Sequence, residues 1–171
     1  IIQQDIVDLL DKHDVSVVDL ADIEPSDWDS HEFYILGIPT WYDGELQSDW
    51  DSHEFYILGI PTWYDGELQS DWEDYFPTFE ELDFNGKTFT IFGLGDQVGY
   101  AEWFCDGVGI LAKAILKNGG KVIGFTNKDE TYDFENSLAL KDKNTFYGLC
   151  LDEDNQPEET AKRINNWIKQ I

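Results

Sequence analysis

The sequence predicts an α/β fold built on a parallel sheet. Short apolar runs alternate with segments of helical periodicity, as in chains whose strands are joined by crossover helices. The runs at 33–38 and 55–60 are apolar throughout, which is typical of strands buried on both faces. With 171 residues, 42% of them hydrophobic, the chain has the size of one domain and can bury a sizeable core. We therefore expect a single domain spanning residues 1–171.

The expected strands follow these apolar and β-rich runs. Residues 33–38 and 55–60 each end at a proline, and residues 88–93 read TFTIFG. Further strands are expected at residues 15–20, 121–125 and 146–151.

Helices are expected between the strands. The final helix should begin at Pro157, because proline suits a first helical turn and the two glutamates after it favour the positive end of the helix dipole. Residues 1–11 and part of 70–82 also have helical character. Another helix should end at the Asn-Gly-Gly of residues 118–120. Its apolar face is formed by Phe104, Val108, Leu111 and Ile115.

The charge of the chain limits its partners. The net charge is −25, and the segment between Lys12 and Lys87 holds 20 Asp and Glu residues without a single Lys or Arg. Nucleic acids and anionic membranes are bound by basic residues, so neither is an expected partner. The acidic segment is either a solvated face or a docking surface for basic proteins, whose encounter is accelerated by complementary charge.

Other features favour a cytoplasmic location. No run approaches the ~20 apolar residues of a membrane span, and no secretory signal is expected at the start. Cys105 and Cys150 lack CxxC spacing and are expected to be buried thiols, which suits a reducing compartment. The histidines, His13, His31 and His53, are expected at the surface rather than as metal ligands.

An identical repeat occupies the first half of the chain. Residues 26–47 recur unchanged at 48–69, and the identity extends over 25 residues at an offset of 22. Solenoid repeats diverge and need about three copies, so two perfect copies indicate a recent duplication, an engineered chain or a sequence-assembly error. Removing one copy leaves a net charge of −20, so the acidic character does not depend on the repeat.

Two loops are suited to binding a flat ligand. In parallel sheets, ligands bind beyond the carboxyl ends of the strands. The chain there reads PTWYDG at 61–66, with a copy at 39–44, and GLGDQVGY at 93–100. One aromatic from each loop could sandwich a ring, while the glycines let the backbone approach it. Considered singly, each aromatic could instead belong to core or rim packing.

Seven segments, in this order, resemble the long-chain flavodoxins: IPTWYDGELQSDW, FNGK, FGLGDQVGYAEWFCD, GGKVIGF, YDF, FYGL and LDEDNQP. The match runs from Val15 to the C-terminus apart from the extra repeat. It implies a flavodoxin-like, doubly wound sandwich with a central, mostly parallel five-stranded sheet, bound FMN and low-potential one-electron transfer. Residues 126–145 resemble the insertion that splits the last strand in the long-chain group.

The resemblance also assigns residues to the FMN site. Trp63, or its copy Trp41, resembles the aromatic over one face of the isoalloxazine ring, and Tyr100 resembles the aromatic over the other face. The other assigned residues are Thr62, Tyr64 and Asp65 (copies Thr40, Tyr42 and Asp43) in the first loop, Leu94, Gly95 and Asp96 in the second, Asp154 after the last strand, and Trp103 and Cys105 at the edge.

The sequence departs from the family pattern at its start. No Thr/Ser-rich phosphate loop follows an opening strand, and the chain begins within what resembles the first helix. Hydrogen bonds to a charged group are worth about 1.5–3 kcal/mol each, so FMN should bind much more weakly without that loop. One hypothesis is that the duplicated run 33–38 fills the strand position beside 55–60 and so restores the sheet to five strands. The alternative is that one copy is looped out or misassembled.

Three functions are compatible with this sequence. The leading one is a monomeric FMN electron carrier, not an enzyme, that passes electrons between basic redox proteins. Carboxylates near the ring would disfavour the anion of reduced flavin, and each ~1.4 kcal/mol of repulsion shifts a one-electron potential by ~59 mV. The alternatives are a flavodoxin-fold variant unable to bind FMN and a flavodoxin-fold quinone reductase, which would need a second substrate pocket.

Overall fold

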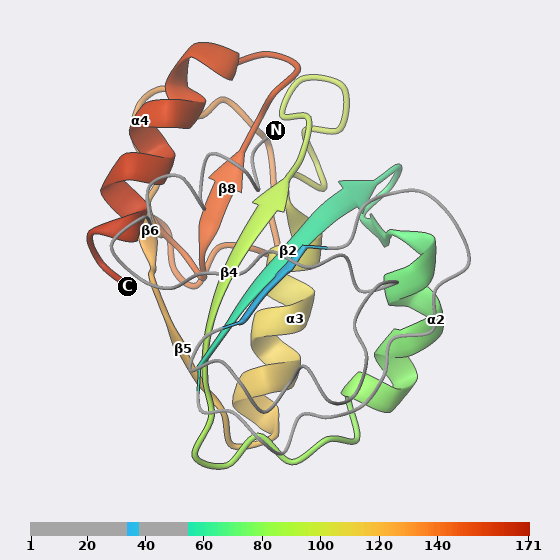
Figure 1. The fold of residues 1–171 in the computed structure, drawn as a ribbon. Helices are drawn as coiled ribbons and strands as arrows, with labels where there is room; N and C mark the ends of the chain where they lie inside the picture. Colours follow the sequence, from blue (N-terminus) through green and yellow to red (C-terminus); the bar gives the residue numbers. More distant parts are fainter. Residues whose placement is uncertain (1–33, 38–54) are drawn as a thin grey trace.

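The computed structural model describes residues 34–37 and 55–171, and three of its helices and eight of its strands lie in this part of the chain (Figure 1). In chain order these elements are β1 (Tyr34–Gly37), β2 (Phe55–Trp63), β3 (Glu67–Leu68), α2 (Ser70–Phe79), β4 (Thr88–Leu94), α3 (Asp106–Lys117), β5 (Lys121–Ile123), β6 (Thr126–Asn127), β7 (Thr145–Phe146), β8 (Leu149–Leu151) and α4 (Pro157–Ile168).

The main sheet is parallel apart from one short strand. β1, β2 and β4 lie side by side, and both β5 and β8 pair with β4. β5 pairs with the first three residues of β4 and β8 with the last three, so the two occupy successive halves of one strand position. The antiparallel β3 adds a sixth strand by folding back on the end of β2.

The pairing of β1 with β2 joins the two copies of the repeat. Tyr34 pairs with Tyr56, and the remaining three residues of β1 likewise pair with their own copies 22 positions later. The expectation that the first copy lies beside the second in the sheet is therefore confirmed for Tyr34–Gly37. The described strands supply four parallel positions, and the fifth expected strand, residues 15–20, lies outside the described residues.

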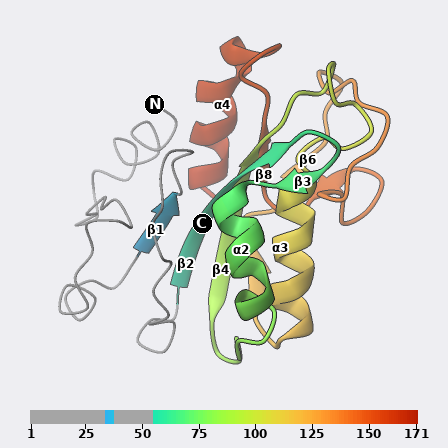
Figure 2. The same cartoon turned by 90° about the vertical axis from the view of Figure 1, so that its right-hand side faces the viewer.

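Helices cover both faces of the sheet, as expected for a doubly wound fold. Even-numbered residues of β2, such as Leu58, pack with α2 and α3 in one apolar cluster. Ile57 points to the other face and joins a second cluster with Phe92 and with Ile164 and Trp167 of α4. Figure 2 shows α4 on one side of the strands and α2 with α3 on the other.

Two expected strands are shorter than the sequence indicated. Residues 121–125 form a strand only to Ile123, because Gly124 has a φ of 73° and its carbonyl accepts the indole N–H of Trp167 at 2.9 Å. The run 146–151 is also divided: β7 pairs with β6 in a separate small sheet, and only β8 joins the main sheet.

The expected helices after residue 70 are confirmed, and their positions bring α3 close to the end of β4. A Cβ on Gly93 would lie 2.3 Å from Cγ2 of Val108, so the close approach of α3 to β4 requires glycine there. No helix among the described residues has the length and apolarity needed to span a bilayer. The expected first helix, the three histidines and the copies at 40–43 lie outside the described residues.

Candidate functional site

A cleft of about 400 Å³ lies beyond the carboxyl ends of β2, β4 and β8. We call it the strand-end cleft. Ligands of open parallel sheets bind at this edge, which makes the cleft the candidate site. Its lining residues are Pro61, Thr62, Trp63, Tyr64, Leu94, Gly95, Asp96, Tyr100, Glu153 and Asp154.

The first wall is a β-hairpin made by the end of β2 and by β3. The register of the two strands leaves only residues 64–66 for the turn. Tyr64 has a φ of 42° and Gly66 a φ of 86°, so both lie in the left-handed region that non-glycine residues rarely adopt. Tyr64 is 62% exposed, and its ring meets that of Trp63 edge-on at 6.3 Å between centroids.

The start of α3 supports this hairpin from behind. The N–H of Gly107 donates to the hydroxyl of Thr62 at 3.0 Å. A Cβ on Gly66 would lie 2.8 Å from Cδ1 of Trp103 and 3.0 Å from Oδ2 of Asp106, so the turn packs directly on these side chains. Trp103 therefore contacts the hairpin and does not line the cleft.

Asp106 is a buried carboxylate within this support. It is 3% exposed, and its Oδ1 accepts the N–H of Leu138 at 2.7 Å. Burial raises the pKa of this carboxyl above its ordinary value, against the opposing effects of the Leu138 N–H and the charge of Lys113. Its position in the first turn of α3 places the charge near the positive end of the helix dipole.

The second wall, residues 94–100, is ordered around Asp96. Its Oδ1 accepts the N–H groups of Val98 at 2.9 Å and Gly99 at 2.7 Å. The bond from Gly99 is the largest cause of the lowered pKa of Asp96. A Cβ on Gly99 would lie 2.3 Å from Oδ2 of Asp96, so any side chain here would displace the carboxylate that orders the loop. The loop presents Tyr100, 38% exposed, to the cleft.

The third wall follows β8 and is tied to the second. Nδ2 of Asn155 donates to Oδ1 of Asp96 at 2.8 Å and lies 3.0 Å from both carboxylate oxygens of Asp152. Asp152 is fully buried and also accepts the N–H of Gln97 at 3.1 Å. The two acidic residues between Asp152 and Asn155 line the cleft, so this network fixes their positions.

The cleft is both aromatic and acidic. It carries three aromatic rings and three carboxylates, and none of its ten lining residues is Lys or Arg. Such a wall suits a flat ring and raises the free energy of any negative charge placed on it. Within the described residues, no group of three or more His, Cys, Asp or Glu is arranged to hold a metal ion.

Eight of the nine predicted site residues come together in this cleft. The ninth, Asp65, is exposed in the hairpin turn and is not among the lining residues. Cys105 is fully buried beneath the second loop, where a Cβ on Gly95 would lie 3.1 Å from its sulfur, and Cys150 is buried as a free thiol as expected.

Sequence reasoning missed four residues of the site. Pro61 and Glu153 line the cleft, and Asp152 and Asn155 hold its second and third walls together. The resemblance through the segment LDEDNQ assigns only Asp154 to the site. A signal was available for Asp152, because a carboxylate directly after an apolar strand and before a turn is well placed to accept backbone N–H groups.

Comparison with known proteins places this architecture in one family. The flavodoxin family model matches residues 47–167. The chain is 50% identical over 164 residues to a flavodoxin of Haemophilus influenzae, covering 96% of this chain and 78% of the relative. It is 49% identical over 164 residues to Flavodoxin 1 of Escherichia coli K12, covering 96% of this chain and 77% of the relative.

The solved structures agree with the sequence comparison. The structure of Fusobacterium nucleatum flavodoxin bound to flavin mononucleotide superimposes with a TM-score of 0.75 at 32% identity, covering 98% of this chain and 86% of the other. Flavodoxin 2 of Bacillus cereus, at 22% identity and a TM-score of 0.56, shares the fold. From its α/β architecture and these matches, the chain belongs to the flavodoxin family.

Proposed function

We propose that the strand-end cleft binds the isoalloxazine ring of FMN and that the chain carries single electrons at low potential between redox proteins. One observation carries the proposal: three loops bring Trp63, Tyr100 and several carboxylates to a single cleft at the strand ends. The Fusobacterium nucleatum relative, of the same fold, is bound to flavin mononucleotide.

The described residues fit the ring of this cofactor. The cleft volume of about 400 Å³ lies within the range of about 300–1,000 Å³ for small-molecule sites. Trp63 and Tyr100 reach the cleft from different loops, which suits stacking on a flat ring. Among its lining residues Thr62 is the single Thr or Ser and none is Lys or Arg, so the cleft has no phosphate loop and we assign it to the ring alone.

FMN supplies the one-electron chemistry when it is bound, and the chain tunes and positions it. Asp96, Glu153 and Asp154 place negative charge around the ring, so adding an electron there costs more free energy than it would in water. Each ~1.4 kcal/mol of this repulsion lowers the potential by ~59 mV. The Asp152–Asn155–Asp96 network holds the second and third walls together and so keeps these charges in place.

Several finer assignments belong to the same proposal. The division of one strand position between β5 and β8, with residues 124–148 between them, supports the long-chain group of flavodoxins. The net charge of −25 supports basic redox partners. Two buried free thiols suit a reducing cytoplasm. We propose that the chain acts there as a monomer and as one domain.

The test is a titration of the purified full chain with FMN, followed by flavin fluorescence and visible absorption. We expect quenched fluorescence and a perturbed absorption band, because Trp63 and Tyr100 would stack on the ring. Trp63→Ala should restore fluorescence, whereas Val98→Ala should not, since Val98 is 69% exposed and is not among the lining residues. Failure of the chain to quench FMN at any concentration would refute the proposal.

A reduction assay separates the carrier from the quinone reductase. The carrier should accept single electrons from a basic reductase and pass them to a second protein. It should show no turnover of a quinone with a reduced nicotinamide beyond that of free FMN. Turnover well above free FMN would instead identify an enzyme.

A further inference from the structure

We propose that a second cavity binds a small organic carboxylate with a flat apolar body. This cavity, which we call the α4 cavity, has a volume of about 230 Å³ and lies between α4 and the segment 125–132. It shares no lining residue with the strand-end cleft, so its ligand would be distinct from FMN.

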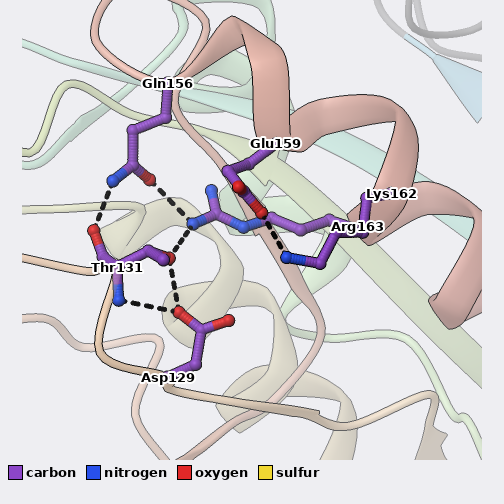
Figure 3. Close-up of polar contacts among 6 residues, drawn as sticks. All are labelled: Asp129, Thr131, Gln156, Glu159, Lys162 and Arg163. Carbon is purple, nitrogen blue, oxygen red and sulfur yellow. Dashed lines mark hydrogen bonds and ion pairs between the residues drawn. The ribbon is translucent and has the colours of Figure 1, made fainter.

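Arg163 is the charged residue that points to an anion. It contributes to the cavity wall, yet it is only 7% exposed. Its Nη2 donates to Oγ1 of Thr131 and to Oε1 of Gln156, both at 2.7 Å (Figure 3). The guanidinium carbon lies 4.0 Å from the centre of the Tyr132 ring, so the group is held by stacking as well as by hydrogen bonds.

Two nitrogens of the Arg163 guanidinium nevertheless lack hydrogen-bond acceptors. Its Nε and Nη1 atoms are buried and have no hydrogen-bond partner. The ion pairs among the described residues join Lys117 with Glu80 and Lys162 with Glu159, and neither includes Arg163. A buried guanidinium with two unpaired nitrogens and no direct ion pair is costly even with the charge of Asp129 nearby, so a carboxylate supplied by a ligand would stabilise this part of the protein.

Asp129 is the acidic residue in the cavity wall, and its carboxylate already accepts hydrogen bonds from Thr131. Asp129 accepts the N–H of Thr131 at 3.0 Å and also its hydroxyl (Figure 3). Burial acts to raise the pKa of Asp129, but these two bonds and the charges of Arg163 and Lys162 lower it overall. Asp129 is therefore ionised and held by Thr131, and it accepts no hydrogen bond from Nε or Nη1 of Arg163.

The rest of the wall indicates the body of the ligand. Phe125, Leu149 and Trp167 give apolar surface, and amide groups are added by Asn166 of α4 and by Gln170 just after it. The volume is below the range of about 300–1,000 Å³ for drug-sized ligands, which limits the ligand to about one substituted ring. A carboxylate matches the guanidinium, and a flat apolar body matches the aromatic surface.

The net charge of the chain opposes any anion at long range. At physiological ionic strength the Debye length is about 8 Å, so distant carboxylates are largely screened. Binding would then be decided by the groups in contact with the ligand, of which Arg163 is the cation. The experiment should accordingly be done at physiological salt.

Benzoate is the probe, added to the purified full chain and followed by the indole N–H signal of Trp167 in ¹H–¹⁵N spectra. This N–H donates to Gly124 beside the cavity, so its chemical shift should report occupancy. We expect a saturable shift with benzoate and none with benzamide, which has the same body without the charge. This comparison needs no variant and therefore does not depend on whether a variant folds.

Three variants complete the test. Arg163→Gln should weaken benzoate binding about tenfold or more, since it removes a charge-assisted hydrogen bond. Lys169→Gln removes the same charge from an exposed position just beyond the end of α4 and should leave binding unchanged. Arg163→Lys keeps the charge without the planar guanidinium and should weaken binding as well.

Three results would overturn the proposal. These are no saturable shift with benzoate at about 10 mM, an equal response to benzamide, and undiminished binding by a folded Arg163→Gln chain. Inorganic phosphate or chloride producing the same shift at the same concentration would also overturn it, because the site would then bind anions in general and not an organic carboxylate.

Discussion

Asn155 donates a hydrogen bond to Asp96 at 2.8 Å, although the two residues are 59 positions apart. The same amide nitrogen lies 3.0 Å from both oxygens of the buried Asp152. One side chain thus joins the loop after β4 to the loop after β8. Since each loop supplies residues to the strand-end cleft, the shape of the cleft depends on this amide.

Replacing Asn155 should therefore weaken both the fold and ligand binding. Asn155→Ala removes donors to two carboxylates, and we expect a loss of about 1–3 kcal/mol in the free energy of unfolding and weaker FMN binding. Asn155→Asp should be worse, because it places a third carboxylate against Asp96 and Asp152. Chemical unfolding and FMN titration measure the two effects.

The matched control is Asn165→Ala. The Asn165 amide bonds only within α4, to the carbonyl of Ala161 at 2.8 Å among the described contacts, and it is exposed. Its replacement should leave FMN binding unchanged. If Asn155→Asp were as stable as the parent chain at neutral pH, the two carboxylates would not be close enough to make this amide important.

The pKa of Asp96 predicts sensitivity to acid. The Gly99 N–H lowers its pKa in the folded state below the value of about 3.9 for an unperturbed Asp. Between these two values the unfolded chain binds more protons than the folded chain, so the stabilising contribution is present above about pH 4 and is lost as the pH falls through the folded pKa. The Asp96→Asn chain should therefore lose less stability than the parent chain on acidification, measured as the thermal midpoint from pH 2 to pH 7.

The pKa of Asp106 predicts a pH dependence of stability opposite to that of Asp96. Burial raises its pKa, so the folded chain retains this proton at a pH at which the unfolded chain has lost it. Its contribution is favourable below about pH 4 and is lost as the pH rises through the folded pKa. Asp106→Asn retains an acceptor for the N–H of Leu138 and should raise the thermal midpoint at pH 7 but not at pH 3.

Asp74→Asn is the control for both carboxylates. Asp74 is exposed on α2, so its replacement changes the net charge by the same amount without altering the cleft. It should shift the thermal midpoint little at either pH. A midpoint for Asp106→Asn that moves in parallel with that of Asp74→Asn would assign the effect to net charge rather than to burial.

The aromatic walls predict a further effect on cofactor binding. Trp63→Ala and Tyr100→Ala should each weaken FMN binding by about 1–3 kcal/mol, the range for base–aromatic stacking. Val98→Ala, in the same loop as Tyr100, should change it little. Because the two aromatics would contact opposite faces of one ring, we expect their effects to be partly non-additive in the double variant. Unchanged FMN affinity in both single variants would show that the ring binds elsewhere.

The sequence predicted the parts of the fold that depend on local pattern. The apolar runs located β1, β2 and β4 to within three residues at each end, and Pro157 correctly marked the first residue of α4. The two loops singled out at residues 61–66 and 93–100 contain eight of the ten residues that line the cleft, and the family resemblance assigned most of these to the FMN site.

The remaining features depend on contacts between distant segments. The bond between Asn155 and Asp96 has no local signature, because it exists only where the loops after β4 and β8 meet. The division of residues 145–151 into β7 and β8 likewise depends on which partner strand each segment meets. Turn signals could have predicted β3, since the Asp-Gly of residues 65–66 is a common hairpin turn.

The pairing of β1 with β2 predicts a role for the first copy of the repeat. Each residue of β1 pairs with its own copy, from Tyr34 with Tyr56 to Gly37 with Gly59, so the first copy supplies backbone hydrogen bonds to one edge of β2. An uncovered edge would leave these backbone groups to water or to another chain. Deleting residues 26–47 should therefore speed amide hydrogen exchange in β2 and lower the free energy of unfolding.

A proline scan of β1 tests the same pairing without changing chain length. Successive N–H groups of a strand point in opposite directions, so of Ile35→Pro and Leu36→Pro one removes a donor to β2 and the other does not. We expect the first to accelerate exchange in β2 more than the second, and Leu36→Thr, which retains the N–H, to accelerate it least. If amide exchange in β2 were as slow in all three variants and in the deletion chain as in the parent chain, the first copy would contribute nothing to the sheet. Faster exchange limited to β2, with α4 unaffected, would show that the duplicated segment stabilises the edge of the sheet locally.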